Sequence, residues 1–206
     1  NRLIERHPIS TGYFWTSYDF AGTKTRQNLL EYPLGPQGVF GGSYGYGDDF
    51  AFEHDGGETI FSLPNGFQAY YLNKADGTSL EKGPTEIVRD LSRTDLAVTN
   101  GISCMGCHDQ GMKNAADEVR THVADNRLLP AEAREAVKAL YPPKEEMDKI
   151  IENDRKRFLD ALGRAGLDPK SKHGTDGEPV NALSNRYERD VDLKSAAAEF
   201  GVDPEK

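Results

Sequence analysis

The chain has 206 residues, of which 36% are hydrophobic and 21 are glycine, a composition typical of a globular protein and not of a disordered one. No stretch approaches the roughly 18 consecutive apolar residues of a membrane-spanning helix, so we expect no membrane span. The 34 acidic and 25 basic residues give a formal net charge of −9, which argues against nucleic acid as a partner and favours a protein with a basic surface.

Strand and turn signals occupy residues 10–100. In chain order they are an aromatic-rich stretch at 13–20, a glycine-rich stretch at 35–47, β-prone runs at 59–63 and 67–72, and turns at 64–66 and 74–77. The turn Pro64-Asn65-Gly66 between two β-prone runs is typical of a hairpin. We therefore predict a small antiparallel sheet, with the aromatic side chains at 13–20 and 44–52 mostly in its core.

Helical signals take over after Gly101, where Ala, Glu, Lys, Arg and Leu become frequent and apolar residues recur with helical spacing. Helices are predicted to start at Pro130, near Met147, at Pro179 and after a capping Asp192, and to stop at Pro142, at Gly163 to Gly166, and at Gly201. A β-rich half followed by a helical half is an α+β chain. We divide it into regions 1–100 and 101–206 of one integrated domain.

The two cysteines stand in the string Cys104-Met105-Gly106-Cys107-His108, the C-x-x-C-H signature of covalent haem attachment. Two thiols three residues apart on one helical turn suit thioether bonds to the two vinyl groups of one porphyrin, and His108 then lies beneath the iron as its proximal ligand. The sequence therefore predicts one haem c, held by Cys104, Cys107 and His108. We expect region 1–100 to cover the apolar ring of that haem.

Two other interpretations of the same cysteines are a zinc site and a redox-active dithiol. A zinc site would need two further ligands at finger spacing, and the chain has no second C-x-x-C and no H-x3–5-H string. A thioredoxin-like dithiol would need its C-x-x-C between a strand and a helix, whereas Thr99-Asn100-Gly101 is predicted as a loop. Both interpretations remain alternatives to haem attachment.

At these residues the chain resembles c-type cytochromes, and the similarity by motif covers Cys104 to His108. The longer strings at 52–58, 63–66 and 100–104 resemble those of secreted monohaem proteins of environmental bacteria. That resemblance implies a haem and export to the periplasm or the cell exterior. The chain begins at Asn1 without an initiator methionine or a signal peptide, so we expect Asn1 to mark a processed or internal boundary.

The ligand on the other side of the iron is predicted by elimination. Met105 lies inside the attachment turn, and Met112 follows His108 by four residues, so on a continuing helix it would lie on the same side of the porphyrin as His108. Met147 suits the apolar stripe of a long helix better than a metal site. We therefore expect His54, beside the glycines of Asp55-Gly56-Gly57, to be the sixth ligand. The alternatives are Met147, the remaining histidines His7, His122 and His173, and a site that is open or holds water, Lys or Tyr.

The predicted function is one-electron transfer by a monohaem c-type cytochrome in an exported compartment, with a basic protein partner. The main alternative is a haem enzyme or sensor whose sixth site admits peroxide or a small gas. A third hypothesis makes the chain the haem module of a larger secreted redox enzyme.

Overall fold

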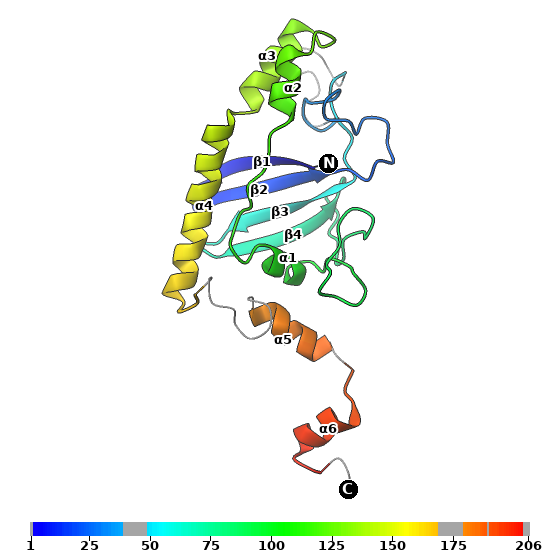
Figure 1. Cartoon of the computed structure of the whole chain (residues 1–206), viewed down its shortest axis with the longest axis vertical. Helices are drawn as coiled ribbons and strands as arrows, with labels where there is room; N and C mark the ends of the chain where they lie inside the picture. The colour runs from blue at the N-terminus through cyan, green and yellow to red at the C-terminus, as the bar shows by residue number, and fades with distance from the viewer. Residues whose placement is uncertain (1, 39–48, 169–178, 189, 204–206) are drawn as a thin grey trace.

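The computed structural model describes residues 2–38, 49–168, 179–188 and 190–203, and the structural statements below concern these residues. They form a four-stranded antiparallel sheet followed by helices, which confirms the α+β prediction (Figure 1). The strands lie in chain order as β1 (Arg2–Ile9), β2 (Gly12–Asp19), β3 (Gly56–Ser62) and β4 (Gln68–Lys74).

The predicted hairpin is β3 and β4, joined by a turn in which Gly66 has a φ of 94°. That left-handed backbone costs glycine little, because glycine has no Cβ. The first strand, β1, was not predicted, since the strand signals were placed from residue 10 onward. Its sequence mixes charged residues with Pro8 at the edge of the sheet, where such residues are tolerated but weaken the strand pattern.

Four of the helices agree with the sequence signals, but the helix that carries the two cysteines ends at Cys107 and does not continue to Met112, as the exclusion of Met112 had assumed. The helices are α1 (Ile102–Cys107), α2 (Val119–Asp125), α3 (Ala131–Leu140), α4 (Lys144–Arg164), α5 (Pro179–Glu188) and α6 (Leu193–Phe200). The predicted cap is present, because the Asp192 side chain accepts a hydrogen bond from the backbone N–H of Ser195, and Gly201 ends α6 with a φ of 65°. Within the described ranges, no helix combines the length and apolarity needed to cross a bilayer.

The sheet has an inner face and an outer face. Trp15, Ile60 and Tyr70 lie opposite one another on β2, β3 and β4 and therefore share the inner face. Figure 1 shows α4 running past the strand ends and α1 lying in front of β4 on this side. The outer face carries the alternate residues of the strands, Phe14 and Phe61 among them.

Both halves of the sequence contribute to each of two core clusters. One cluster joins Phe20 and Phe52 to Val123 and Val137 of the helical half, and a second joins Trp15 and Ile60 to Ile151 of α4. The aromatic residues at 13, 15, 20 and 52 are buried as predicted. Tyr44, Tyr46 and most of the glycine-rich stretch lie outside the described residues.

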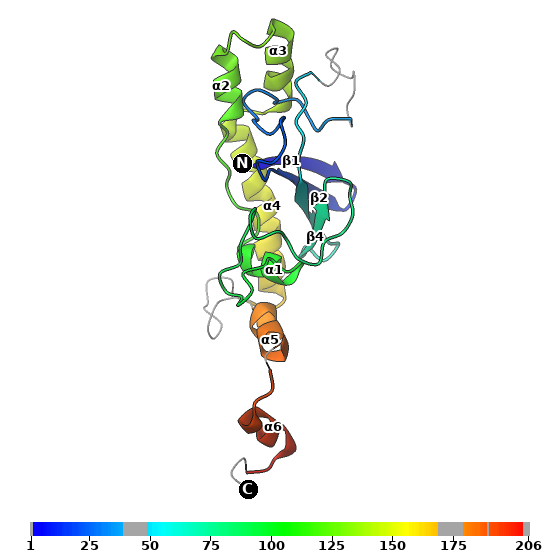
Figure 2. The same ribbon diagram turned by 90° about the vertical axis from the view of Figure 1, so that its right-hand side faces the viewer.

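The last two helices lie beyond the end of the sheet (Figure 2). Helix α5 contacts α1, where the Asn181 side chain donates a 3.4 Å hydrogen bond to the carbonyl of Ile102. A Cβ on Gly106 would lie 2.9 Å from the same side chain. Gly106, inside the C-x-x-C string, thus allows α5 to approach the helix that carries both cysteines.

Candidate functional site

The two cysteines lie on α1 in different surroundings. Gly101, with a φ of 79°, precedes the helix, and the Ser103 hydroxyl accepts a 3.0 Å hydrogen bond from the backbone N–H of Thr99. Cys104 is 2% exposed and packs with Leu72 and Val98, whereas Cys107 is exposed to solvent. The loop, not a strand, that enters α1 is unlike the strand-to-helix junction of thioredoxin-type dithiols.

The environment of Cys104 favours a neutral sulfur. Burial raises the pKa of the Cys104 thiol, and both the charge of Glu58 and a hydrogen bond with its carboxylate raise that pKa further. A thiol that acts as a nucleophile in disulfide exchange needs the opposite shift, toward thiolate. A thioether is uncharged, so the same surroundings suit a Cys104 that is covalently bonded to a haem vinyl group.

His108 follows directly after α1 and is almost fully buried. Its Nδ1 lies 3.2 Å from the backbone carbonyl of Gly111, and burial lowers the pKa of His108 although Glu58 and the Gly111 carbonyl oppose that shift. The side chain is therefore a neutral imidazole whose Nδ1–H donates to Gly111, which leaves the lone pair on Nε2. This is the form in which histidine binds a metal.

A carboxylate lies on the Nε2 side of His108. Glu58 Oε2 is 4.0 Å from His108 Nε2, too far for a hydrogen bond, and both side chains are 11% exposed. Arg2 Nη1 lies 3.8 Å from the same Glu58 oxygen. The Tyr70 ring lies beside the imidazole, with 6.1 Å between ring centroids. Cys104, His108 and Glu58 thus meet on the inner face of the sheet.

The structure does not bring His54 to this group. The His54 ring makes an edge contact with Tyr18 at 5.1 Å, and Tyr18 donates a hydrogen bond to Glu5 on the outer face. Burial and the charge of Lys24 lower the pKa of His54, so this imidazole is also neutral. His54 and His108 therefore lie on opposite faces of the sheet.

The glycines beside His54 also have a different role from the predicted one. Gly56 and Gly57 were expected to let a side chain approach a flat cofactor. They lie inside β3, and a side chain on either would collide with backbone of a neighbouring strand, at Asn73 of β4 and Ser17 of β2 respectively. The glycine pair therefore serves strand pairing.

The other predicted iron ligands are also placed apart from Glu58 and His108 or have packing roles. Met112 is 6% exposed in the cluster of Trp15 and Ile60, and Met147 packs against the same cluster. His7 stacks on the Phe14 ring at 4.6 Å on the outer face, and His122 is exposed on α2. His173 lies outside the described residues.

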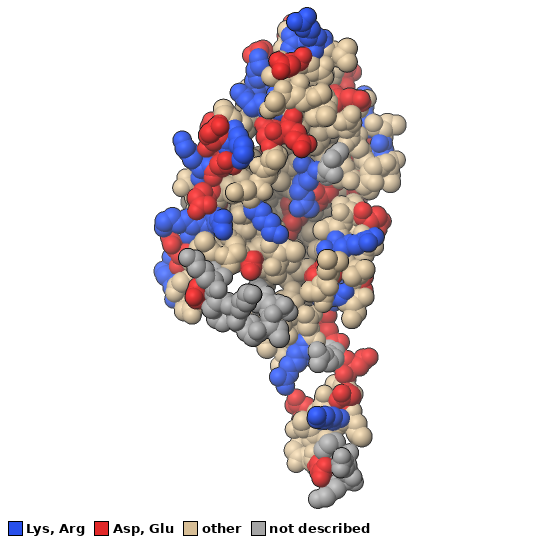
Figure 3. Space-filling view, viewed as in Figure 1, with Lys and Arg blue, Asp and Glu red and all other residues tan. Residues whose placement is uncertain are grey.

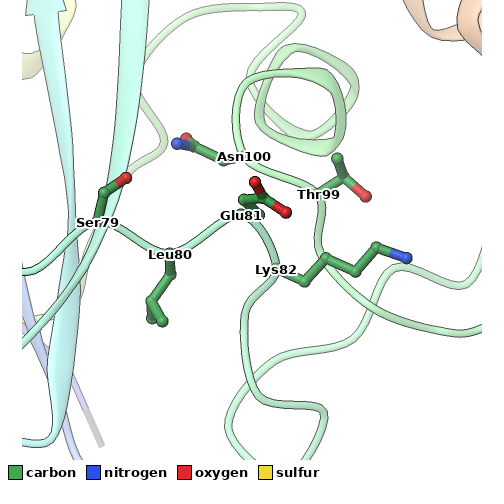
Figure 4. Close-up of a pocket in the computed structure, with 6 residues that line it drawn as sticks. All are labelled: Ser79, Leu80, Glu81, Lys82, Thr99 and Asn100. Atoms are coloured by element: carbon green, nitrogen blue, oxygen red, sulfur yellow. The ribbon is translucent and has the colours of Figure 1, made fainter.

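A surface pocket of about 380 Å³ lies beside the start of α1 (Figure 4). Its lining comes from the segment after β4 and from the two residues that precede Gly101: Ser79, Leu80, Glu81, Lys82, Thr99 and Asn100. It does not include Cys104, Cys107 or His108. The pocket therefore adjoins the attachment string without forming part of it.

Glu58 is the residue that the sequence reasoning missed. A signal was available, because every second residue of the run from 56 to 62 shares a face. Glu58 is two residues before the core residue Ile60 and therefore lies on the same face. A carboxylate at an inward position of a strand is costly unless it is paired or functional. The direction of the inward face, however, depends on where the helices pack.

Comparison of the chain with models of known protein families, with curated proteins and with solved structures found no match. Across the described ranges, no group of three or more His, Cys, Asp or Glu side chains is arranged to hold a metal ion by itself. The donor set of Cys104, Cys107 and His108 does fit a haem c, because one thiol is exposed, the other is kept neutral, and the imidazole has its Nε2 lone pair free.

Proposed function

We propose that this chain is a monohaem c-type cytochrome that transfers one electron in an exported compartment. The observation that supports this most is the state of His108, a buried neutral imidazole whose Nδ1–H is held by the Gly111 carbonyl. It stands directly after two cysteines on one helix. A dithiol function would leave this histidine without a role, whereas a haem ligand needs that tautomer.

The two cysteines and His108 would hold the haem in different ways. Cys104 and Cys107 would anchor the porphyrin through thioether bonds, and His108 would bind the iron through Nε2. When bound, the haem supplies a ferric/ferrous couple. The inner face of the sheet and its aromatic side chains exclude water from His108, which strengthens the electrostatic effect of nearby charges on that couple.

The surface is compatible with a charged redox partner. Acidic and basic side chains are interspersed over the face seen in Figure 3, while the whole chain carries a formal net charge of −9. That charge favours encounter with a partner whose surface is basic. Covalent haem attachment and the resemblance to secreted cytochromes together support the periplasm or the cell exterior as the compartment.

The mass of the intact chain tests the proposal. After expression with a haem-attachment system, we expect one haem per chain that acidic organic solvent does not extract. Cys107→Ala should retain at most one thioether, with the α band of the reduced haem shifted to the red. A wild-type mass equal to that of the bare polypeptide would overturn the proposal.

A haem enzyme or sensor is the second candidate, and one observation favours it. Among the described residues, the structure places neither a histidine nor a methionine opposite His108 Nε2, where Glu58 lies. A site without a second imidazole or a thioether can admit a small ligand. Ready binding of cyanide or peroxide by the ferric protein would favour this candidate, and a low-spin spectrum unchanged by either would favour electron transfer.

A further inference from the structure

Glu58 stands out among the charged residues of the sheet because it is buried without a hydrogen-bonded cation. Its side chain is 11% exposed, and the nearest cationic group, Arg2 Nη1, is 3.8 Å away. Arg2 itself is directed mainly to Asp19, to which it donates hydrogen bonds of 2.5 and 2.9 Å. The charge of Glu58 is thus only partly compensated.

The position of Glu58 relative to the attachment string is specific. Its carboxylate lies 4.0 Å from His108 Nε2, and its charge helps to raise the pKa of the nearby Cys104 thiol. Since Nδ1 is committed to Gly111, iron can bind only at Nε2, on the side where Glu58 lies. Within the described ranges, no other carboxylate oxygen lies within 4.0 Å of this imidazole.

We infer that Glu58 is the side chain that faces the haem iron from the Nε2 side of His108, and that its carboxylate lowers the reduction potential of the haem. The inference rests on the proposed haem. A negative charge close to the iron in a water-poor site stabilises the ferric state relative to the ferrous state. In this arrangement the potential depends on Glu58, and His54 has no part in it.

Redox titration of the haem-loaded full chain tests the inference. Glu58→Gln keeps the shape of the side chain and removes its charge, so we expect the midpoint potential to rise. Glu5→Gln is the matched control, because Glu5 is also a hydrogen-bonded carboxylate of the sheet but lies on the outer face. It should leave the potential close to that of the wild type, as should His54→Ala.

A second variant changes the potential in the opposite direction. Arg2→Gln removes the cation 3.8 Å from Glu58 and leaves the carboxylate in place, so we expect the potential to fall. If Glu58→Gln does not retain haem, Glu58→Asp decides the matter: it keeps the charge on a shorter side chain, farther from His108 Nε2, so we expect a smaller rise of the potential, and an unchanged potential would overturn the inference.

Haem content, measured by mass on the same samples, separates the two proposals. Wild-type protein without haem would overturn the proposed function. Haem-loaded Glu58→Gln with an unchanged potential would overturn the inference about Glu58 and leave the proposed function intact. A shift of the potential in Glu5→Gln or His54→Ala as large as the rise in Glu58→Gln would also overturn it, because the effect would then not depend on the Nε2 side of His108.

Discussion

The Trp15 indole N–H donates a 2.8 Å hydrogen bond to the Asp154 carboxylate and so joins β2 to α4 across the inner face of the sheet. The guanidinium of Arg6 donates two more hydrogen bonds to the same carboxylate, at 2.8 and 3.0 Å. Asp154 is 5% exposed. One buried acidic side chain of the helical half therefore holds two strands of the β-rich half.

Asp154→Ala should lower the free energy of unfolding by about 3 kcal/mol, because it leaves the Arg6 charge and the Trp15 N–H without their partner. Urea denaturation followed by tryptophan fluorescence measures this loss. Asp160→Ala is the control, since Asp160 forms an exposed i,i+4 ion pair with Lys156 on the same helix. We expect that control to cost at most about 0.5 kcal/mol, and equal costs for the two variants would contradict the assigned role of Asp154.

The cysteines of the haem-free, reduced chain should react with iodoacetamide at different rates. Cys107 is exposed, whereas Cys104 is buried and burial raises the pKa of its thiol. Because the thiolate is the reactive form, Cys107 should be modified first and Cys104 should be at least about tenfold slower near neutral pH. Peptide mass spectrometry gives the two rates. They should converge in denaturant, and convergence already in the folded protein would mean that α1 does not pack as described.

Asp90 should make stability depend on acid pH. Burial of its carboxyl raises the pKa, but hydrogen bonds from Ser103 and Ser92 and the charge of Arg93 together lower it by more, so the pKa in the folded protein lies below its usual value. The unfolded chain then binds the proton more readily. The stabilisation by Asp90 is therefore complete above the usual pKa of about 4 and is lost as the pH falls through the lower pKa of the folded state.

Urea midpoints measured from about pH 6 to about pH 3 should show this loss, and Asp90→Asn should reduce its slope. The Asn side chain keeps the size of Asp90 but does not titrate. Since Ser103 lies on α1 directly before Cys104, the same variant reports whether acid loosens α1. An identical slope in Asp90→Asn and the wild type would rule out this source of the pH dependence.

Alanine substitutions at two turn glycines, Gly66 and Gly77, distinguish the cost of a strained backbone from the cost of a steric clash. Gly66 and Gly77 have φ values of 94° and 83°, but only at Gly66 would a Cβ meet a neighbour, 2.9 Å from Ala161 Cβ on α4. Gly77→Ala should cost about 1 kcal/mol from the left-handed backbone alone. Gly66→Ala should cost about 1–3 kcal/mol more because it forces the hairpin away from α4. Thermal or urea unfolding measures both, and similar costs would mean that the hairpin does not pack on that helix.

The sequence by itself determined the features that depend on neighbours along the chain. Cys104, Cys107 and His108 are close in sequence, so the haem attachment that we propose could be predicted from their spacing alone. The hairpin turn, the caps of the helices and the division into a sheet followed by helices were also predicted, because turn and cap residues act through local backbone geometry.

The tertiary structure decided which side chains share a face with His108. His54 was chosen by elimination, but the alternation of strand residues places its contacts on the outer face, and only the packing of α1 and α4 makes the other face the inner one. Glu58 reaches His108 for the same reason, across 50 residues of sequence. Alternation along a strand determines which residues share a face of the sheet. The helices that cover the sheet determine which of the two faces lies against residues 104–108.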